Sequence, residues 1–215
     1  MGVGMNKTKT KIILQAIQLY NELGFSSVTN QQIAKASGVS LSNFNYHFAT
    51  KQDLVHAIFE YMANILVDEV YGQNSLIDTG NGWEITKRYF VYEQQFKFFY
   101  LETPIIIRTY PELQDKLRKQ FDDSIQLIKN LSYLAIGKGL MKPEPEDMPG
   151  LYHRLAEQIW MSNHFWIAQS FMRGTDEDVV NKGLSAAMSI IYPYLTEKGK
   201  ASYAETLESM VTTTP

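Results

Sequence analysis

Residues 29–51 read TNQQIAKASGVSLSNFNYHFATK, and this stretch decides how the chain is organised. Thr29 is followed three residues later by Gln32, a capping box that starts a helix. Gly38 can take the left-handed backbone that ends a short helix, and Ser40 can cap the next one. Two short helices joined by a tight glycine turn form the helix-turn-helix pattern.

The second of these helices offers an uncharged outer side with hydrogen-bonding groups. Leu41, Phe44 and Phe48 occupy its apolar positions. The other positions are polar or carry a polar tip, and none is acidic: Ser42, Asn43, Asn45, Tyr46 and His47. Such side chains suit base edges and the phosphates beside them. The alternative is a solvated corner of an all-α protein that binds no nucleic acid.

Residues 11–59 resemble the N-terminal domain of the TetR/AcrR family of bacterial transcription regulators. The resemblance rests on Ile13, Leu14, Ala16, Leu19, Gly24, Phe25, Val28, Thr29, Ile33, Ala34, Ala36, Gly38, Val39, Ser40, Phe44, Tyr46, His47, Phe48, Lys51 and Leu54. Two positions depart from the family pattern. Ser42 stands where the family most often has Gly, and Asn45 stands where it usually has a Tyr that packs on the DNA backbone. An Asn at this position can instead read adenine through a bidentate pair.

The resemblance implies which residues contact DNA. We expect the DNA backbone to be held by Thr29, Ser40, Asn43, Tyr46, His47 and Lys51, and Asn30 is a further DNA-binding candidate. We expect contacts with base edges or methyl groups from Leu41, Ser42 and Asn45. Lys51 lies in the first turn of a helix that Thr50 caps, where free N–H groups also favour a phosphate.

Composition and charge agree with a nucleic-acid partner and exclude several kinds of site. The 215 residues contain no cysteine, which excludes disulfides and thiolate metal sites and fits a reducing cytoplasm. No apolar run approaches the roughly 18 residues of a membrane span. Residues 1–51 carry five lysines and one acid, a sum of +4, whereas the remainder carries 15 basic and 22 acidic residues, a sum of −7. A chain with a basic N-terminal part and an acidic remainder is expected to bind the phosphates of a nucleic acid through its N-terminal part.

The spacing of apolar residues predicts an all-α chain with two domains. We expect a helix-turn-helix DNA-binding domain at 6–52 with its motif at about 30–49, a connecting helix at 53–71, a ligand-binding and dimerisation domain at 83–198, and a polar tail at 199–215. Residues 72–82 contain three glycines and two asparagines and predict a loop between the domains.

Residues 83–101 are aromatic on almost every side, which predicts a buried helix. Further helices are expected to begin at Pro104 and Pro111. Some of the aromatic rings are expected to line a cavity for a hydrophobic or aromatic effector, and the alternative is that they only fill the core. The candidate cavity residues are Tyr89, Tyr92, Glu93, Phe96, Phe99, Tyr100, Phe121, Ile125, Trp160 and His164.

Two long apolar helices are expected at 150–172 and 176–197, the second capped by Thr175. Together they predict a four-helix interface with a second copy of the chain, and the alternative is the core of a monomer. The candidate interface residues are Trp160, Ile167, Phe171, Leu184, Ala187, Met188 and Ile191.

No motif of a known catalytic site is present, so we expect neither an enzyme nor a cofactor. His153 and Glu157 have the spacing of two metal ligands, but nothing supplies a third, so no metal site is expected. The sequence therefore predicts a homodimeric repressor that a small molecule releases from double-stranded operator DNA. Three alternatives remain: an activator of the same fold, an all-α interaction protein with altered DNA binding, and an enzyme with a helical cavity.

Overall fold

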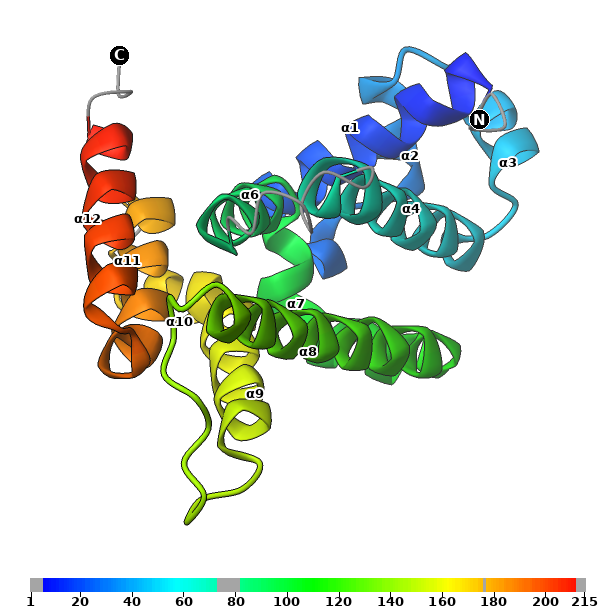
Figure 1. The fold of residues 1–215 in the computed structure, drawn as a ribbon. Coiled ribbons are helices and arrows are strands. Elements are labelled where there is room, and N and C mark those ends of the chain that lie inside the picture. Colours follow the sequence, from blue (N-terminus) through cyan, green and yellow to red (C-terminus); the bar gives the residue numbers. More distant parts are fainter. Residues whose placement is uncertain (1–5, 73–81, 176, 212–215) are drawn as a thin grey trace.

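The computed structural model describes residues 6–72, 82–175 and 177–211, with side chains through Glu205, and confirms the all-α class (Figure 1). The N-terminal domain contains α1 (Lys7–Leu23), the 3-10 turn η1 (Phe25–Ser27), α2 (Asn30–Ala36), α3 (Leu41–His47) and α4 (Lys51–Ile65). The body contains the π-helical η2 (Leu66–Tyr71), α6 (Gly82–Gln95), α7 (Lys97–Thr109), η3 (Pro111–Leu113), α8 (Gln114–Gly137), α9 (Leu151–His164), α10 (Trp166–Met172), α11 (Val179–Ile191), η4 (Tyr192–Tyr194) and α12 (Glu197–Val211).

The ends of the short N-terminal helices follow from local side-chain chemistry, as predicted. Thr29 Oγ1 accepts a hydrogen bond from the Gln32 N–H, and Gln32 Oε1 accepts from the Thr29 N–H. Ser40 Oγ accepts from the Asn43 N–H at 3.1 Å and starts α3. Gly38 has a φ of +65° in the turn between the two helices, a conformation that favours glycine. These contacts set the angle between α2 and α3.

The aromatic segment is two helices rather than one, because a contact from the N-terminal domain starts the second. Asn21 Oδ1 accepts from the Phe98 N–H at 2.8 Å, and Asn21 Nδ2 donates to the Gln95 carbonyl at 2.9 Å. The chain turns at Phe96 and continues as α7. Pro104, expected to start a helix, lies inside α7. Burial of the α7 rings outweighs the cost of an internal proline.

The expected C-terminal helices are also shorter than predicted. The chain breaks at Phe165 between α9 and α10. Asp178, with a φ of +54°, precedes α11, and the Thr175 N–H donates to the Ser170 carbonyl instead of marking a helix start. Pro193 lacks an N–H donor, and α11 gives way to η4 there. In the body α8 packs along α9, and α11 packs on α6 and α9.

The polar tail expected from residue 199 is wrong over most of its length, because Glu197–Val211 form α12 (Figure 1). Tertiary contacts hold this polar helix. The Thr196 N–H donates to the Leu140 carbonyl at 3.0 Å, and the rings of Trp83 and Tyr203 lie 5.5 Å apart. At Gly199 a Cβ atom would lie 2.0 Å from the Leu140 carbonyl oxygen, so the close approach requires glycine.

None of the helices in the described ranges is long and apolar enough to cross a membrane.

Candidate nucleic-acid interface

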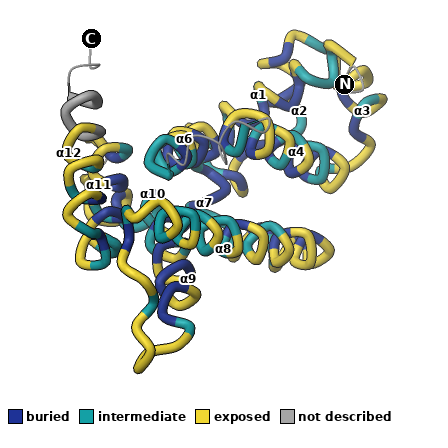
Figure 2. Tube along the Cα trace, viewed as in Figure 1, coloured by how far each residue is buried: buried dark blue, intermediate teal, exposed yellow. Residues whose placement is uncertain are grey.

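Helix α3 is anchored on one side and open on the other (Figure 2). Phe44 and Phe48 are buried beneath it, with ring centroids 6.0 Å apart. Tyr46 is 84% exposed and Leu41 is 44% exposed. The remaining exposed residues of the helix are Ser42, Asn43 and Asn45, whereas His47 is half-buried with its ring 5.3 Å from that of Tyr46. The arrangement fixes the backbone of α3 while leaving uncharged hydrogen-bonding groups free to meet another surface.

The two capping hydroxyls of the motif, those of Thr29 and Ser40, differ in whether their O–H group is free to donate to a phosphate. Thr29 Oγ1 donates to Gln32 Oε1 and accepts from the Gln32 N–H, so its donor is used within the capping box. Ser40 Oγ accepts from the Asn43 N–H. A hydroxyl keeps one donor when it accepts, so Ser40 is the better candidate for a phosphate contact. Asn30 occupies the first helical position of α2 and is half-buried.

Positive charge gathers beside the turn. Lys9 Nζ lies 5.3 Å from the centroid of the Phe48 ring, and Lys11 Nζ would be 3.5 Å from a Cβ placed on Gly38. Lys35 is exposed in the last turn of α2. Helix α1 therefore places two ammonium groups near the motif, one at the turn and one at the Phe48 ring that follows α3.

Lys51, expected to contact a phosphate, is directed inward. Its ammonium donates to the carbonyls of Phe25 and Val28 at 3.1 and 3.3 Å and lies 4.5 Å from the centroid of the Phe25 ring. Burial lowers the pKa of Lys51, against a smaller opposing effect of Glu102. Since these contacts use the ammonium to hold η1, we leave Lys51 out of the candidate interface.

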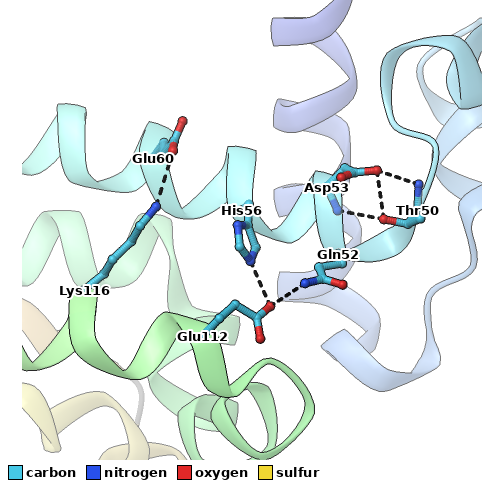
Figure 3. A network of polar contacts seen from close by, with 7 residues as sticks. All are labelled: Thr50, Gln52, Asp53, His56, Glu60, Glu112 and Lys116. Carbon is cyan, nitrogen blue, oxygen red and sulfur yellow. Dashed lines mark hydrogen bonds and ion pairs between the residues drawn. The ribbon is translucent and has the colours of Figure 1, made fainter.

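Helix α4 is tied to the body along one side (Figure 3). Glu112 Oε1 accepts from Gln52 Nε2 at 2.8 Å and lies 2.9 Å from His56 Nε2. The hydrogen bond with His56 is the main cause that lowers the pKa of Glu112. One helical turn further on, Lys116 and Glu60 form an ion pair at 3.5 Å. Thus η3 and the start of α8 contact the helix that follows the motif.

A second junction joins the end of α1 to α7. The Phe25 N–H donates to Glu102 Oε1 at 2.7 Å, and Asn21 bridges to the start of α7 as described above. The Phe25 ring also meets Tyr110 edge-on at 6.1 Å. Helix α7 and the residue that follows it therefore contact the N-terminal domain directly.

Most of the aromatic residues expected to line a ligand cavity are core residues. Tyr92, Phe96, Phe99 and Tyr100 are at most 5% exposed and pack on one another. The Tyr92 hydroxyl donates to the Met62 carbonyl at 3.1 Å, a further link to α4. These four residues belong to the core. Tyr92 also lines a pocket of about 210 Å³ between η2 and α6, and Phe99 lines one of about 10 Å³.

The other expected cavity residues form a buried cluster with unpaired polar atoms. His164 stacks on Trp160 at 5.0 Å and meets Phe121 at 4.8 Å, and burial lowers its pKa to about 4. Glu93 is 0% exposed and neither of its carboxylate oxygens has a hydrogen-bond partner. Burial raises the pKa of Glu93 well above its usual range, against a smaller effect of the Tyr89 hydroxyl. Ile125 is half-buried on α8.

Two adjoining cavities lie beside this cluster. The larger has a volume of about 290 Å³ and lies between α6, α8, α9, α11 and α12. The smaller has a volume of about 50 Å³, and Tyr89 and Trp160 are among its walls. Thr86, Ile128 and Leu131 line both. Sequence reasoning missed the larger cavity, because α12 forms part of its wall and was expected to be a tail.

The residues expected at an interface between two copies are mostly buried within one chain. Ile167, Leu184, Ala187 and Met188 are at most 4% exposed, so they belong to the core of the protomer. Ile191 is half-buried and, with Ala187, lines the larger cavity, and Trp160 is half-buried in the cluster around His164. Phe171 is 56% exposed and remains available. Other exposed apolar residues on α9 and α10 are Met161, Phe165 and Met172.

Comparison with known proteins finds separate family matches for the N-terminal part and for the body. The family described as "Bacterial regulatory proteins, tetR family" matches residues 12–58, and the family described as "Bacterial transcriptional repressor" matches residues 69–203. The chain is 29% identical over 111 residues to IcaR of Staphylococcus aureus, a negative transcriptional regulator of the biofilm operon icaADBC, covering 50% of this chain and 54% of that protein. It is 33% identical over 66 residues to the regulator YerO of Bacillus subtilis, covering 31% of this chain and 23% of that protein.

The matches thus span about half of the length of IcaR and less than a quarter of the length of YerO.

Solved structures are similar to this chain over most of its length. A TetR-family regulator from Marinobacter aquaeolei VT8 has a TM-score of 0.81 at 22% identity, covering 95% of this chain and 98% of that one. A regulator from Saccharomonospora viridis in complex with choline has a TM-score of 0.71 at 15% identity, covering 90% and 100%. The two family matches together take in both the helix-turn-helix domain and most of the body, and the chain belongs to the TetR family of bacterial transcriptional regulators.

Proposed function

We propose that the protein is a homodimeric transcriptional repressor that binds operator DNA through α3 and releases it when a small molecule enters the body. The observation that carries this proposal is the open, uncharged side of α3. The ammonium groups of Lys9 and Lys11 lie near the same motif, at the Phe48 ring and at Gly38. Base edges are read by uncharged donors and acceptors, while lysines neutralise phosphates. In this proposal Ser40, Asn43, Tyr46 and His47 meet the DNA backbone.

Base reading is assigned to three residues of α3. Asn45 is exposed and can form a bidentate pair with adenine, and Leu41 can contact a thymine methyl group. Ser42 is exposed on the same short helix and can pair with either purine. A good bidentate pair, such as the one proposed for Asn45, favours the correct base over a wrong one by about 1–3 kcal/mol.

A second copy of the chain would place the two α3 helices in successive major grooves, about 34 Å apart. The exposed apolar residues of α9 and α10 support a paired surface on this side of the body: Met161, Phe165, Phe171 and Met172. Large apolar side chains left exposed on neighbouring helices are candidates for a protein interface. The pairing proposed here uses these residues in place of those buried in the protomer core.

Helix α8 supports a route from the body to the motif. Its distal half lines the larger cavity through Ile128, Leu131 and Ala135, and its first turns pair with α4 through Lys116. A ligand that binds one position of α8 better than another would shift the population of α4 positions. A dimer whose α3 helices no longer match the groove spacing would then leave the operator.

The proposal is tested by selecting duplexes that bind the full chain from a random library and measuring affinity by fluorescence anisotropy. We expect a near-palindromic site. Lys7, Lys9, Lys11 and Lys35 supply at most eight phosphate contacts per dimer, so log Kd should change with log salt by a slope of no more than about 7. Selection of no sequence would favour the alternative of an interaction protein that has lost DNA binding.

A matched pair of variants tests the role of α3. Asn45→Ala should reduce the preference for the selected site over random DNA by about tenfold or more. Asn64→Ala, an exposed asparagine at the far end of α4, should leave that preference unchanged. An Asn45→Ala protein with full preference would contradict the assignment of Asn45 as a base reader. A reporter gene behind the selected site separates a repressor from an activator.

A further inference from the structure

The two adjoining cavities of the body differ in chemistry. The larger has many apolar wall residues, among them Ile128, Leu131, Ala135, Met141 and Leu195. Its polar wall residues are Thr86, Ser132, Ser202 and one charged residue, Lys138. Its volume of about 290 Å³ lies at the lower end of the range for small-molecule sites. Such walls favour an apolar chain or ring system, since burial of apolar surface drives its binding.

The wall of the smaller cavity is mostly apolar, but two of its residues hold buried polar atoms without a partner. Trp160 and Asn163 line it, and Trp160 Nε1 and Asn163 Oδ1 are both buried without a hydrogen-bond partner. Asn163 is 6% exposed. A buried donor and a buried acceptor that are both unpaired cost free energy, so a ligand group that satisfies both gains affinity and selectivity.

Neighbouring polar groups of the smaller cavity are already paired. The Ser124 hydroxyl donates to the Gln120 carbonyl, so the Tyr71 hydroxyl donates to Ser124 Oγ at 2.9 Å. Thr86 Oγ1 donates to the Gly82 carbonyl. No Lys, Arg, Asp or Glu is among the described residues that line this cavity. An ionised group placed there would lose its hydration without gaining an opposite charge.

We infer that the two cavities form one site for an uncharged amphiphile, with its apolar part in the larger cavity and a small hydroxyl or primary amide head in the smaller one. The head accepts a hydrogen bond from Trp160 Nε1 and donates one to Asn163 Oδ1. The volume of about 50 Å³ admits a head of only a few atoms. The effect of this ligand on DNA rests on the proposed function, whereas its binding does not.

A series of probes with one tail and different heads tests the inference on the full chain without DNA. The probes are 1-decanol, decanoate and decyltrimethylammonium, and binding is followed by calorimetry and by tryptophan fluorescence. We expect 1-decanol to bind at least about tenfold more tightly than either charged probe. Equal binding of the three, or tightest binding of a charged probe, overturns the inference.

Variants locate the two parts of the ligand. Asn163→Leu should weaken 1-decanol binding about tenfold, because the head loses its acceptor. Ala135→Trp should weaken all three probes by filling the larger cavity. Asn130→Leu, which changes an exposed residue of α8, is the matched control and should bind as the unmodified chain does. Circular dichroism and the melting temperature identify a variant that fails to fold. If Asn163→Leu fails to fold, Trp160→Phe removes the other proposed hydrogen bond to the ligand head, and its binding of 1-decanol is measured by calorimetry.

DNA release is measured separately, so that the two claims can fail independently. If 1-decanol binds with the expected selectivity but leaves the operator complex intact, the site is supported and ligand-controlled release is not. If the chain binds its operator and none of the probes binds the body, the inference about the site is wrong and DNA binding stands.

Discussion

Replacement of Glu93 by glutamine should stabilise the protein, and the gain should grow with pH. Glu93 is fully buried and neither oxygen is paired, so burial raises the pKa of its carboxyl well above the usual range. At a pH above 4.5 but below this raised pKa, the unfolded chain has released the proton while the folded chain retains it. The free energy of unfolding therefore falls as the pH rises, by about 1.4 kcal/mol per pH unit.

The glutamine side chain of the Glu93→Gln variant is nearly the same size as glutamate and does not titrate. The variant therefore lacks the decrease in the free energy of unfolding that Glu93 causes as the pH rises. For a chain of 215 residues, 1 kcal/mol corresponds to about 2–4 °C in Tm. The Tm difference between variant and unmodified protein should therefore rise by about 3–6 °C per pH unit from about pH 5 until the pH reaches the raised pKa of folded Glu93. Other titrating groups occur in both proteins and cancel in this difference.

The assay is thermal unfolding by circular dichroism at pH 5, 6, 7 and 8, with Glu22→Gln as the control. Glu22 is exposed on α1, so its variant should show a flat difference. A flat or falling difference for Glu93→Gln would refute the reasoning, because it would mean that Glu93 is ionised and stabilised by a partner in the folded state.

Three further changes test other contacts. Lys51→Met should lower the free energy of unfolding by about 1–3 kcal/mol, measured by urea denaturation, because two carbonyls lose a charged donor; unchanged stability with weaker DNA binding would return Lys51 to the DNA interface. His164→Phe should reduce the loss of Tm between pH 7 and pH 4.5. The pKa of His164 is about 4 in the folded protein and 6.5 in the unfolded chain, so the free energy of unfolding decreases as the pH is lowered through this window. The total decrease is roughly 3 kcal/mol once the pH is below 4. If the variant lost as much Tm as the unmodified protein, this prediction would be wrong. Gly199→Ala should displace α12 from the Leu140 carbonyl, which lowers the Tm and speeds proteolysis after residue 196; a protease pattern like that of the unmodified chain would disagree.

The helix-turn-helix could be predicted from the sequence because its determinants are local. Thr29 and Gln32 are three residues apart, Gly38 needs only its own backbone, and Phe44 and Phe48 lie one helical turn apart. Capping and periodicity act over such distances. The DNA contacts themselves stay a prediction.

The features that were missed depend on residues far apart in the chain. Lys51 meets the carbonyls of Phe25 and Val28, and α12 depends on the approach of Gly199 to Leu140. A pattern of apolar residues also cannot tell burial within one chain from burial between two. For this reason Leu184, a core residue of the protomer, was expected at the interface.

Helix α8 is 24 residues long, which corresponds to about 36 Å. Its first turns touch α4 and its later turns wall the larger cavity, so its two ends make separate contacts. Under the proposed function, substitutions near Ala135 would change which compound is recognised while Lys116 keeps its partner. A change of ligand would then need no change in the connection to α4.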